Sequence, residues 1–402
     1  MKILVISHMY PSSLNPVYGI FVHKKVKALL EMGHEIRVIS PVPWAPWPLK
    51  HLKKKWRTYA SMPFKDSWEG VTVYYPRYPE SPRSVFLEKS DFFMYQGLKN
   101  LVTKIYREFK FDLLHAHVAL PDGGAGIYFK EKYRVPLVVT VHGRDFQSTL
   151  KKGPGCRQKL FEILAKADQV ITVSSKLKNL VREQEFASKI KVVPNGINPQ
   201  DLPRAGAFPD RAGEKRMVSV SNLKKIKGID LNLKALAQLL KTYPHLRYTI
   251  VGEGPERKNL ENLVKDLKLE DKVEFRGQLP NPKALEEMAK GDLFSLPSYE
   301  EGFGVVYLEA MALGLPTIGV LGEGIEDVIT DGENGLLVRP RDVEHLAQTL
   351  LKVLTNPDLA ARLGKAGRET VLNNFTWERV AQKITEIYEE LDKNSTSRKN
   401  LR

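Results

Sequence analysis

Two carboxylate side chains stand eight positions apart in the segment "PSYEEGFGVVYLEAMALGLP", Pro297 to Pro316. Glu301 precedes a Gly-Phe-Gly sequence, and Glu309 lies in the apolar run after it. Either glutamate alone is typical of a helix start or a solvated loop. Together with Gly302 and Gly304, which let a ligand approach backbone amides, they indicate a binding site. The expected ligand is anionic and carries hydroxyl groups, two of which donate hydrogen bonds to Glu309.

A lysine-rich turn, "SVSNLKKIKGID", follows the apolar run Met217–Val220. Its polar members before Gly228 are Asn222, Lys224, Lys225 and Lys227. A merely solvated lysine cluster is unfavourable here because cations oppose the dipole at a helix start. A fixed ammonium instead stabilises the charge that develops on a departing diphosphate. The turn therefore predicts a lysine that contacts phosphate.

Two histidines also follow apolar runs. His142, in "VHGRD", comes directly after Leu137–Val141. A lone histidine at a strand end is more often structural, but the His-Gly-x-Asp sequence favours a binding role for His142. Asp145 is expected to orient His142 or to contact a second substrate. His117 and Asp122, in "HAHVALPDG", are further candidates for that second contact.

Short apolar runs between helical stretches must position these side chains. They lie at Ile3–Ser7, Ile36–Ile39, Leu113–Ala116, Leu137–Val141, Val170–Val173, Ile190–Val193, Met217–Val220, Tyr248–Val251, Val273–Arg276, Leu293–Leu296 and Pro316–Val320. Val/Ile/Leu runs of this kind indicate parallel sheets covered on both faces. Ligands of such sheets bind outside the carboxyl ends of the strands. The fold class is therefore α/β, with two Rossmann-like domains facing a cleft.

The length of 402 residues agrees with two domains. The segment "NPQDLPRAGAFPDRAGEK" has proline, glycine and charge without periodicity, as a linker does. The expected organisation is an N-terminal domain at 1–197, this linker at 198–215, a C-terminal domain at 216–375, a helix at 376–392 that returns to the N-terminal domain, and a disordered tail at 393–402.

Composition limits the compartment and the partners. The single cysteine, Cys156, fits a reducing compartment, and the apolar start is too short for a secretory signal. A cytoplasmic protein without a membrane-spanning helix is expected. The net charge of +15 belongs to the first half, where residues 1–200 hold 32 Lys and Arg against 16 Asp and Glu. This asymmetry suggests an anionic partner, although lysine-rich surfaces also serve solubility.

The motifs resemble those of the retaining glycosyltransferases of family 4, which have the GT-B fold. The resemblance covers nearly the whole chain. Its segments are "GIFVHKKVKALLEMGHEIRVIS", "HAHVALPDG", "VTVHGRD", "VVPNGIN", "PSYEEGFGVVYLEAMALGLPTIG" and "IEDVITDGENGLLVRPRD". In the last, "IED" stands where the family has Pro-Glu. The family's Gly-Arg-Leu before Lys227-Gly228 reads Ser221-Asn222-Leu223, so its arginine is missing and Lys224 or Lys225 is left to replace it. The best likeness is to bacterial and archaeal transferases of teichuronic acid, capsule or exopolysaccharide assembly.

The resemblance implies transfer of a hexose from a UDP- or GDP-sugar, with retention, to a saccharide or lipid-linked acceptor, without metal or another cofactor. It assigns the ribose to Glu309, the diphosphate to Lys227 and Gly19, and the sugar to Glu301 and His142. The implied catalytic residues are Glu301, His142 and Lys227. The implied donor-binding residues are Gly19, Asn222, Lys227, Gly252, Gly277, Glu301, Gly302, Phe303, Gly304 and Glu309. The acceptor candidates are His117, Asp122 and Asp145.

One stretch outside the family motifs, "VPWAPWPLKHLKKKWRTYA", combines basic residues with a narrow apolar stripe at helical spacing. Such a helix lies at an anionic bilayer surface. The membrane candidates are Trp44, Trp47, Lys53, Lys54, Lys55, Trp56 and Arg57. The equal alternative is that the stripe docks on the N-terminal domain and the lysines are solvated. The first interpretation predicts peripheral attachment to the inner face of the plasma membrane.

Three other functions remain as alternatives. A nucleic-acid-binding protein would explain the basic half but needs aromatic platforms or a recognition helix, and none stands out. A nicotinamide-dependent oxidoreductase is disfavoured because "VGEGP" lacks the third glycine of the dinucleotide fingerprint, with Arg257 in its place. A sugar-nucleotide epimerase would keep the GT-B fold and change the reaction.

Overall fold

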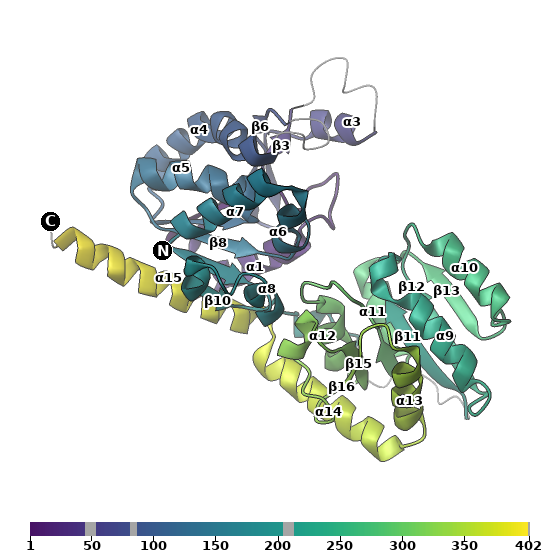
Figure 1. The fold of residues 1–402 in the computed structure, drawn as a ribbon. Coiled ribbons are helices and arrows are strands. Elements are labelled where there is room, and N and C mark those ends of the chain that lie inside the picture. The colour runs from purple at the N-terminus through teal and green to yellow at the C-terminus, as the bar shows by residue number, and fades with distance from the viewer. Residues whose placement is uncertain (45–53, 81–86, 204–212, 401–402) are drawn as a thin grey trace. The chain divides into compact units, whose positions relative to one another are not determined.

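The computed structural model describes residues 1–44, 54–80, 87–203 and 213–400, without the side chains of Lys54, Lys55, Arg144 and 394–400. The chain divides into two compact units (Figure 1). Unit 1 comprises Met1–Pro194 and Trp377–Arg402, and unit 2 comprises Asn195–Thr376. Each unit is a mostly parallel sheet with covering helices, as the apolar runs predict.

Among the described residues of unit 1, eight strands form one sheet in the order β10-β9-β8-β7-β1-β2-β5-β4. They are β1 (Lys2–Ile6), β2 (Glu35–Ile39), β4 (Lys65–Trp68), β5 (Val71–Tyr74), β7 (Leu113–His117), β8 (Leu137–Val141), β9 (Gln169–Thr172) and β10 (Ile190–Val192). From β1 the chain adds β2 on one side of the sheet, and from β7 it adds β8 on the opposite side. The strand order therefore reverses between β1 and β7. This reversal is the topological switch point of unit 1, where doubly wound sheets bind ligands.

The helices of unit 1 connect these strands. They are α1 (Ile20–Glu31), α3 (Lys54–Ser61), α4 (Ser90–Phe109), α5 (Gly124–Tyr133), α6 (Arg144–Gln147), α7 (Pro154–Lys166), α8 (Ser175–Asn179) and α15 (Trp377–Asn400), with the single turns η2 (Leu87–Lys89), η3 (Ala119–Gly123), η4 (Thr149–Lys152) and η5 (Glu185–Lys189). The sequence patterns missed the antiparallel hairpin β4–β5 and the short pair of β3 (Val42–Pro43) with β6 (Arg77–Tyr78). Two positive φ angles, 43° at Glu69 and 84° at Gly70, make the hairpin turn.

The last helix, α15, belongs to unit 1 and packs against α1 (Figure 1). Its apolar face is part of the core that α1 and the sheet share, through Trp377, Val380, Ala381, Ile384, Ile387 and Tyr388. The disordered tail expected from residue 393 onward is wrong up to Asn400, where the helix ends. Once the packed part is helical, each added residue gains a backbone hydrogen bond without a new nucleation cost.

Unit 2 repeats the architecture with a smaller sheet. Among its described residues, six parallel strands follow the order β13-β12-β11-β14-β15-β16. They are β11 (Lys215–Val220), β12 (Leu246–Val251), β13 (Val273–Gly277), β14 (Leu293–Ser295), β15 (Thr317–Val320) and β16 (Leu336–Val338). Its helices and turns are η6 (Pro199–Asp201), η7 (Lys225–Lys227), α9 (Ile229–Leu239), α10 (Arg257–Asp266), α11 (Asn281–Ala289), α12 (Val305–Ala312), η8 (Gly324–Asp327), α13 (Val343–Leu354) and α14 (Pro357–Asn374). The switch point of unit 2 lies between β11 and β14.

Candidate active site

The switch point of unit 2 brings the two predicted motifs together. β11 and β14 are neighbours, with Met217 opposite Leu293, so the loops that leave their carboxyl ends meet. The Tyr299 amide donates to the Ile226 carbonyl at 2.8 Å. Gly228 has a φ of 66°, and a Cβ there would lie 2.2 Å from the Pro297 carbonyl oxygen. Only glycine permits this approach.

The contact between the loops places Lys227 against Glu301. The Lys227 ammonium donates to the Oε2 atom of Glu301, to which the Ser298 hydroxyl also donates at 3.0 Å. The two charged side chains are only 14% and 19% exposed, which weakens screening of the pair by water. A cation and an anion are therefore held side by side at the ligand-binding edge of the sheet.

A third carboxylate, which the sequence patterns did not single out, holds the Glu301 loop. Glu323 is 9% exposed and accepts from the backbone amides of Glu300 at 3.1 Å and Glu301 at 2.7 Å. Glu300 itself has a φ of 59°, a conformation that a non-glycine residue adopts only when its surroundings enforce it. A signal was available, because Glu323 stands between Gly322 and Gly324 just after a strand.

The rest of the glutamate motif is divided between surface and core. Glu309 lies on α12 and is partly exposed. Gly304 precedes α12 with a φ of 88°, and a Cβ there would lie 2.6 Å from the Tyr307 ring. Phe303 is only 3% exposed, so its ring is part of the core. Any contact of Phe303 with a ligand is therefore through its backbone, unlike the partly exposed Gly302 beside it.

The glycine turns after β12 and β13 pack against the lysine-rich turn. The Gly252 amide donates to the Gly277 carbonyl at 2.8 Å, and a Cβ on Gly252 would lie 1.8 Å from the Ser221 carbonyl oxygen. Asn222 is exposed in this group of loops. Lys225 donates to Asp230 at 3.2 Å, which turns its ammonium toward the start of α9. Of the two lysines considered as replacements for the missing arginine, Lys225 thus has a carboxylate partner already.

In unit 1, Gly19 occupies the start of α1. Its φ is 71°, and a Cβ would lie 2.3 Å from the Met9 carbonyl oxygen. The loop from β1 to α1 therefore folds back on itself, and any side chain at position 19 would push it apart. Gly19, His117, Asp122, His142 and Asp145 all belong to unit 1, whereas the other predicted donor-binding residues belong to unit 2.

His142 ends a stack of three imidazoles inside unit 1. His115 stacks on His117 with ring centroids 4.4 Å apart, and His117 stacks on His142 at 5.2 Å. His117 Nδ1 and His142 Nε2 lie 3.0 Å apart, so one nitrogen donates a hydrogen bond and the other accepts it. At the inner end, His115 contacts the Tyr388 hydroxyl at 2.6 Å and the Thr140 hydroxyl at 2.7 Å.

Burial keeps this stack neutral. It lowers the pKa of His115 to about 3 and holds the pKa of His117 and of His142 well below their usual range. Lys25 on α1 is fully buried, its Nζ has no hydrogen-bond partner among the described residues, and burial lowers its pKa to about 7. When Lys25 is protonated, its charge further disfavours protonation of the three histidines. His142 therefore meets its surroundings as a neutral ring.

The acceptor candidates His117, Asp122 and Asp145 are buried in this structure, with at most 1% of each residue exposed. Asp122 instead accepts from His8, a residue that the sequence patterns missed. Asp145 accepts from the Ala119 amide at 2.9 Å, and burial raises its pKa to about 6. The three side chains support their neighbours and do not form the surface.

The proposed membrane segment is described only in part. Trp47 and Lys53 lie outside the described residues, as do the side chains of Lys54 and Lys55. Trp44 is 55% exposed, and Arg57 on α3 is exposed. Trp56 meets Tyr59 edge to face, and Tyr59 packs against the core of unit 1. No described helix is long and apolar enough to span a bilayer.

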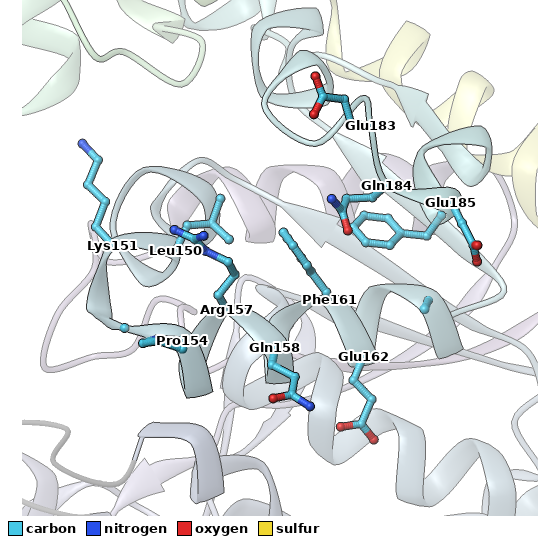
Figure 2. A pocket seen from close by; sticks show the side chains of 13 residues that line it. Leu150, Lys151, Pro154, Arg157, Gln158, Phe161, Glu162, Glu183, Gln184 and Glu185 are labelled. Atoms are coloured by element: carbon cyan, nitrogen blue, oxygen red, sulfur yellow. The ribbon is translucent and has the colours of Figure 1, made fainter.

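Unit 1 also contains a cavity of about 880 Å³ between α7 and the segment that enters η5 (Figure 2). Phe161 and Phe186 lie in it with ring centroids 5.6 Å apart, and Leu150, Arg157 and Gln184 surround them. None of the predicted site residues lines this cavity. Among the described residues, no group of three or more His, Cys, Asp or Glu side chains is arranged to hold a metal ion.

Comparisons with known proteins agree with this arrangement. The family model "Glycosyltransferase Family 4" matches residues 19–201, and "Glycosyl transferases group 1" matches residues 207–370. TuaC of Bacillus subtilis, which its name assigns to teichuronic acid biosynthesis as a glycosyltransferase, is 29% identical over 98% of this chain and 100% of its own length. N-acetyl-alpha-D-glucosaminyl L-malate synthase of Bacillus anthracis is 28% identical over 90% of this chain and 91% of its own.

Solved structures share the fold. Sucrose-phosphate synthase from Thermosynechococcus elongatus superposes with a TM-score of 0.78 at 24% identity, covering 97% of this chain and 99% of that one. HepE of Anabaena, solved in complex with UDP, gives a TM-score of 0.72 at 19% identity, covering 97% and 100%. With one family model on each half of the chain and two Rossmann-like units, this protein belongs to glycosyltransferase family 4 and has the GT-B fold.

Proposed function

We propose that this glycosyltransferase transfers a hexose from a UDP- or GDP-sugar, with retention and without a metal ion, to a saccharide or lipid-linked acceptor. The process it serves is synthesis of a cell-surface polysaccharide or glycolipid. The observation that carries the proposal is the Lys227–Glu301 pair at the switch point of unit 2. The ion pair places a cation that can bind a diphosphate directly beside a carboxylate that can bind sugar hydroxyls.

Lys227 supplies the charge that the leaving group needs. As the bond from the sugar to the diphosphate breaks, negative charge grows on the phosphate oxygens, and a fixed ammonium lowers that barrier. Gly19 of unit 1 and the amides of Gly302–Gly304 contribute backbone donors to the phosphates and the sugar. Glu309 holds the ribose, and the turns at Gly252 and Gly277 line the base pocket.

Glu301 positions the sugar rather than attacking it. Its Oε2 atom already accepts from Lys227 and Ser298, which lowers its nucleophilicity and fixes its orientation. Oε1 is the atom left to accept from a sugar hydroxyl. The family resemblance assigns His142 of unit 1, which burial keeps neutral, to the sugar as well. The departing phosphate guides the acceptor hydroxyl to the face from which it leaves, which preserves the anomeric configuration.

Relatives support the donor and acceptor classes. HepE was solved with UDP-glucose, and TarM of Staphylococcus aureus with UDP and alpha-GlcNAc-glycerol. Alpha-monoglucosyldiacylglycerol synthase of Acholeplasma laidlawii, 24% identical over 98% of this chain, is named for a lipid product. Together with the teichuronic-acid relative, these names favour an acceptor at the cell surface.

The proposal is tested with a panel of UDP-, GDP- and ADP-hexoses in the presence of EDTA. The expected result is slow donor hydrolysis and thermal stabilisation by one nucleoside diphosphate, because a ligand that binds only the folded state raises its stability. Proton NMR of the first product should show the anomer of the donor. An inverted product would refute retention. Conversion of a sugar nucleotide to its epimer without transfer to any acceptor would favour the epimerase.

Peripheral attachment to an anionic membrane is part of the proposal, motivated by the exposed Trp44 and the basic segment after it. Replacing Lys53, Lys54, Lys55 and Arg57 with glutamine should lower the partition constant for phosphatidylglycerol vesicles roughly 100- to 1,000-fold, since each basic residue near such a surface contributes about 1 kcal/mol. Partitioning equal to that of the unmodified protein would support the alternative in which the stripe only docks on unit 1.

A further inference from the structure

The switch point of unit 1 carries a histidine–aspartate pair that the proposed donor site does not use. His8 follows β1 and Asp122 follows β7, the two strands between which the sheet order reverses. Both positions therefore lie where a doubly wound sheet binds a ligand. The pair spans 114 residues of sequence and is formed only by the fold.

The geometry fixes the imidazole in one orientation. His8 Nδ1 donates to Asp122 Oδ2 at 2.7 Å, and the His8 backbone amide lies 3.2 and 3.3 Å from the two carboxylate oxygens. Asp122 is fully buried, whereas the His8 side chain is 26% exposed. The carboxylate is thus behind the ring, and Nε2 lies on the side of the ring away from it. In the neutral ring this Nε2 is a hydrogen-bond acceptor.

The other imidazoles near this edge of unit 1 are engaged differently. His23 contacts Tyr10 and Glu69 with its two nitrogens, and its side chain is 1% exposed. His115 uses both nitrogens inside the core, and His117 is equally buried. His8 is the imidazole at the switch point that combines exposure with a buried carboxylate partner.

We propose that His8, oriented by Asp122, binds a hydroxyl group of the acceptor through Nε2. The inference rests on the proposed transferase function and adds the acceptor-binding group that the buried side chains of His117, Asp122 and Asp145 do not supply. The ligand class is a neutral sugar or polyol hydroxyl. Asp122 is a positioning residue that selects the tautomer with the proton on Nδ1, and Asp145 supports the loop beside it through the Ala119 amide.

The charges around His8 set a pH dependence. Burial opposes protonation of His8, but Asp122 with Asp145 and Glu80 outweighs it and raises the pKa of the ring. His142, which also faces this region, is neutral. Below the raised pKa, Nε2 carries a proton and no longer accepts from a hydroxyl. Acceptor binding should therefore weaken as the pH falls through that pKa, while donor binding in unit 2 should not follow it.

The first experiment observes His8 directly, without requiring turnover. The full chain is labelled with 15N-histidine, and the His8 resonances are assigned by their loss in His8→Gln. We expect an Nδ1–H ring at pH 8 whose Nε2 resonance shifts on titration with octyl glucoside below its micelle concentration. Asp122→Asn should lose the single tautomer. An Nε2 resonance that octyl glucoside leaves unchanged would overturn the proposal.

The second experiment separates acceptor binding from donor chemistry. With a donor that the enzyme hydrolyses, His8→Phe should raise KM for octyl glucoside at least tenfold and leave donor hydrolysis within about twofold. His8→Gln, which keeps an acceptor atom, should recover part of the loss. His23→Gln removes another histidine–carboxylate pair of unit 1 and should behave as the unmodified enzyme.

The outcomes distinguish the two proposals. A wild-type enzyme without donor hydrolysis would count against the transferase function, and the NMR titration would still decide the role of His8. Equal losses of hydrolysis and transfer in His8→Phe would mean that the residue serves the fold or the donor, and would refute an acceptor role. Donor hydrolysis without any transfer to octyl glucoside would exclude the proposed hydroxyl class.

Discussion

The two switch points are alike in topology and opposite in electrostatics. In unit 2, Lys227 and Glu301 form a partly exposed ion pair. In unit 1, the described residues at the same edge include the neutral imidazoles of His115, His117 and His142, and the partly exposed His8 has a buried carboxylate behind it. A diphosphate is stabilised by a cation that the protein already holds in place. A neutral hydroxyl needs a correctly oriented hydrogen-bond partner instead. The difference agrees with our proposals that Lys227 of unit 2 contacts the charged diphosphate and that His8 of unit 1 contacts a neutral acceptor hydroxyl.

The largest effect should come from removing the cation of unit 2. Lys227→Ala should lower kcat about 100- to 1,000-fold, the cost of losing one group that stabilises a developing anion. Lys234→Ala removes an exposed lysine of the adjacent helix and should have no such effect. If both variants turned over donor equally, another group would stabilise the leaving diphosphate. The charge of Lys227 would then not explain the difference between the two units.

A smaller loss is expected from Glu309→Ala. A hydrogen bond to a charged group is worth about 1.5–3 kcal/mol, so affinity for free nucleoside diphosphate should fall roughly 10- to 100-fold. Isothermal titration with UDP and GDP measures this without an acceptor. Unchanged affinity for the diphosphate that stabilises the wild type would remove the ribose role.

Glu323→Gln tests whether catalysis requires the Glu301 loop to be ordered before the donor binds. The substitution keeps the shape but weakens the bonds from the amides of Glu300 and Glu301, so kcat should fall about tenfold with little change in thermal stability. Glu326→Gln, an exposed position in the same short turn, is the matched control. A Glu323→Gln enzyme with full activity would show that the loop is organised by Lys227 and Ser298 alone.

The last prediction concerns stability in unit 1. The Lys25 pKa is lowered from 10.5 to about 7, so between these values the unfolded chain binds the proton and the folded one does not. Stability lost through Lys25 is therefore greatest at pH 7 and below, and vanishes as the pH approaches 10.5. Lys25→Met should raise the free energy of unfolding by a few kcal/mol at pH 7 and by much less at pH 10. Denaturant titrations at the two pH values measure the difference, and a gain independent of pH would contradict a buried neutral amine.

Much of the fold followed from local pattern. The apolar runs predicted the central strands of both sheets, and the rule that ligands bind beyond strand ends drew attention to Lys227, Glu301 and His142. The strand predictions succeeded because the alternation of strands and helices is encoded in contiguous residues, whereas the roles of the three side chains stay predictions. The hairpin β4–β5 was missed because four residues are too few for their alternation to stand out and β4 has no buried residue. The end of α15 was misjudged because helix extension past a packed segment needs no apolar pattern.

Sequence alone thus determined the class of fold, the family and the motifs that bear charge, since each depends on residue types at short spacing. Tertiary structure alone decided which motifs meet. Glu323 reaches the Glu301 loop because β14 and β15 are neighbours, and Asp122 reaches His8 because β1 and β7 are neighbours. It also decided that His117 and Asp145 are buried supports. The physical reason is that strand order and burial arise from packing between segments far apart in the chain, which no local spacing encodes.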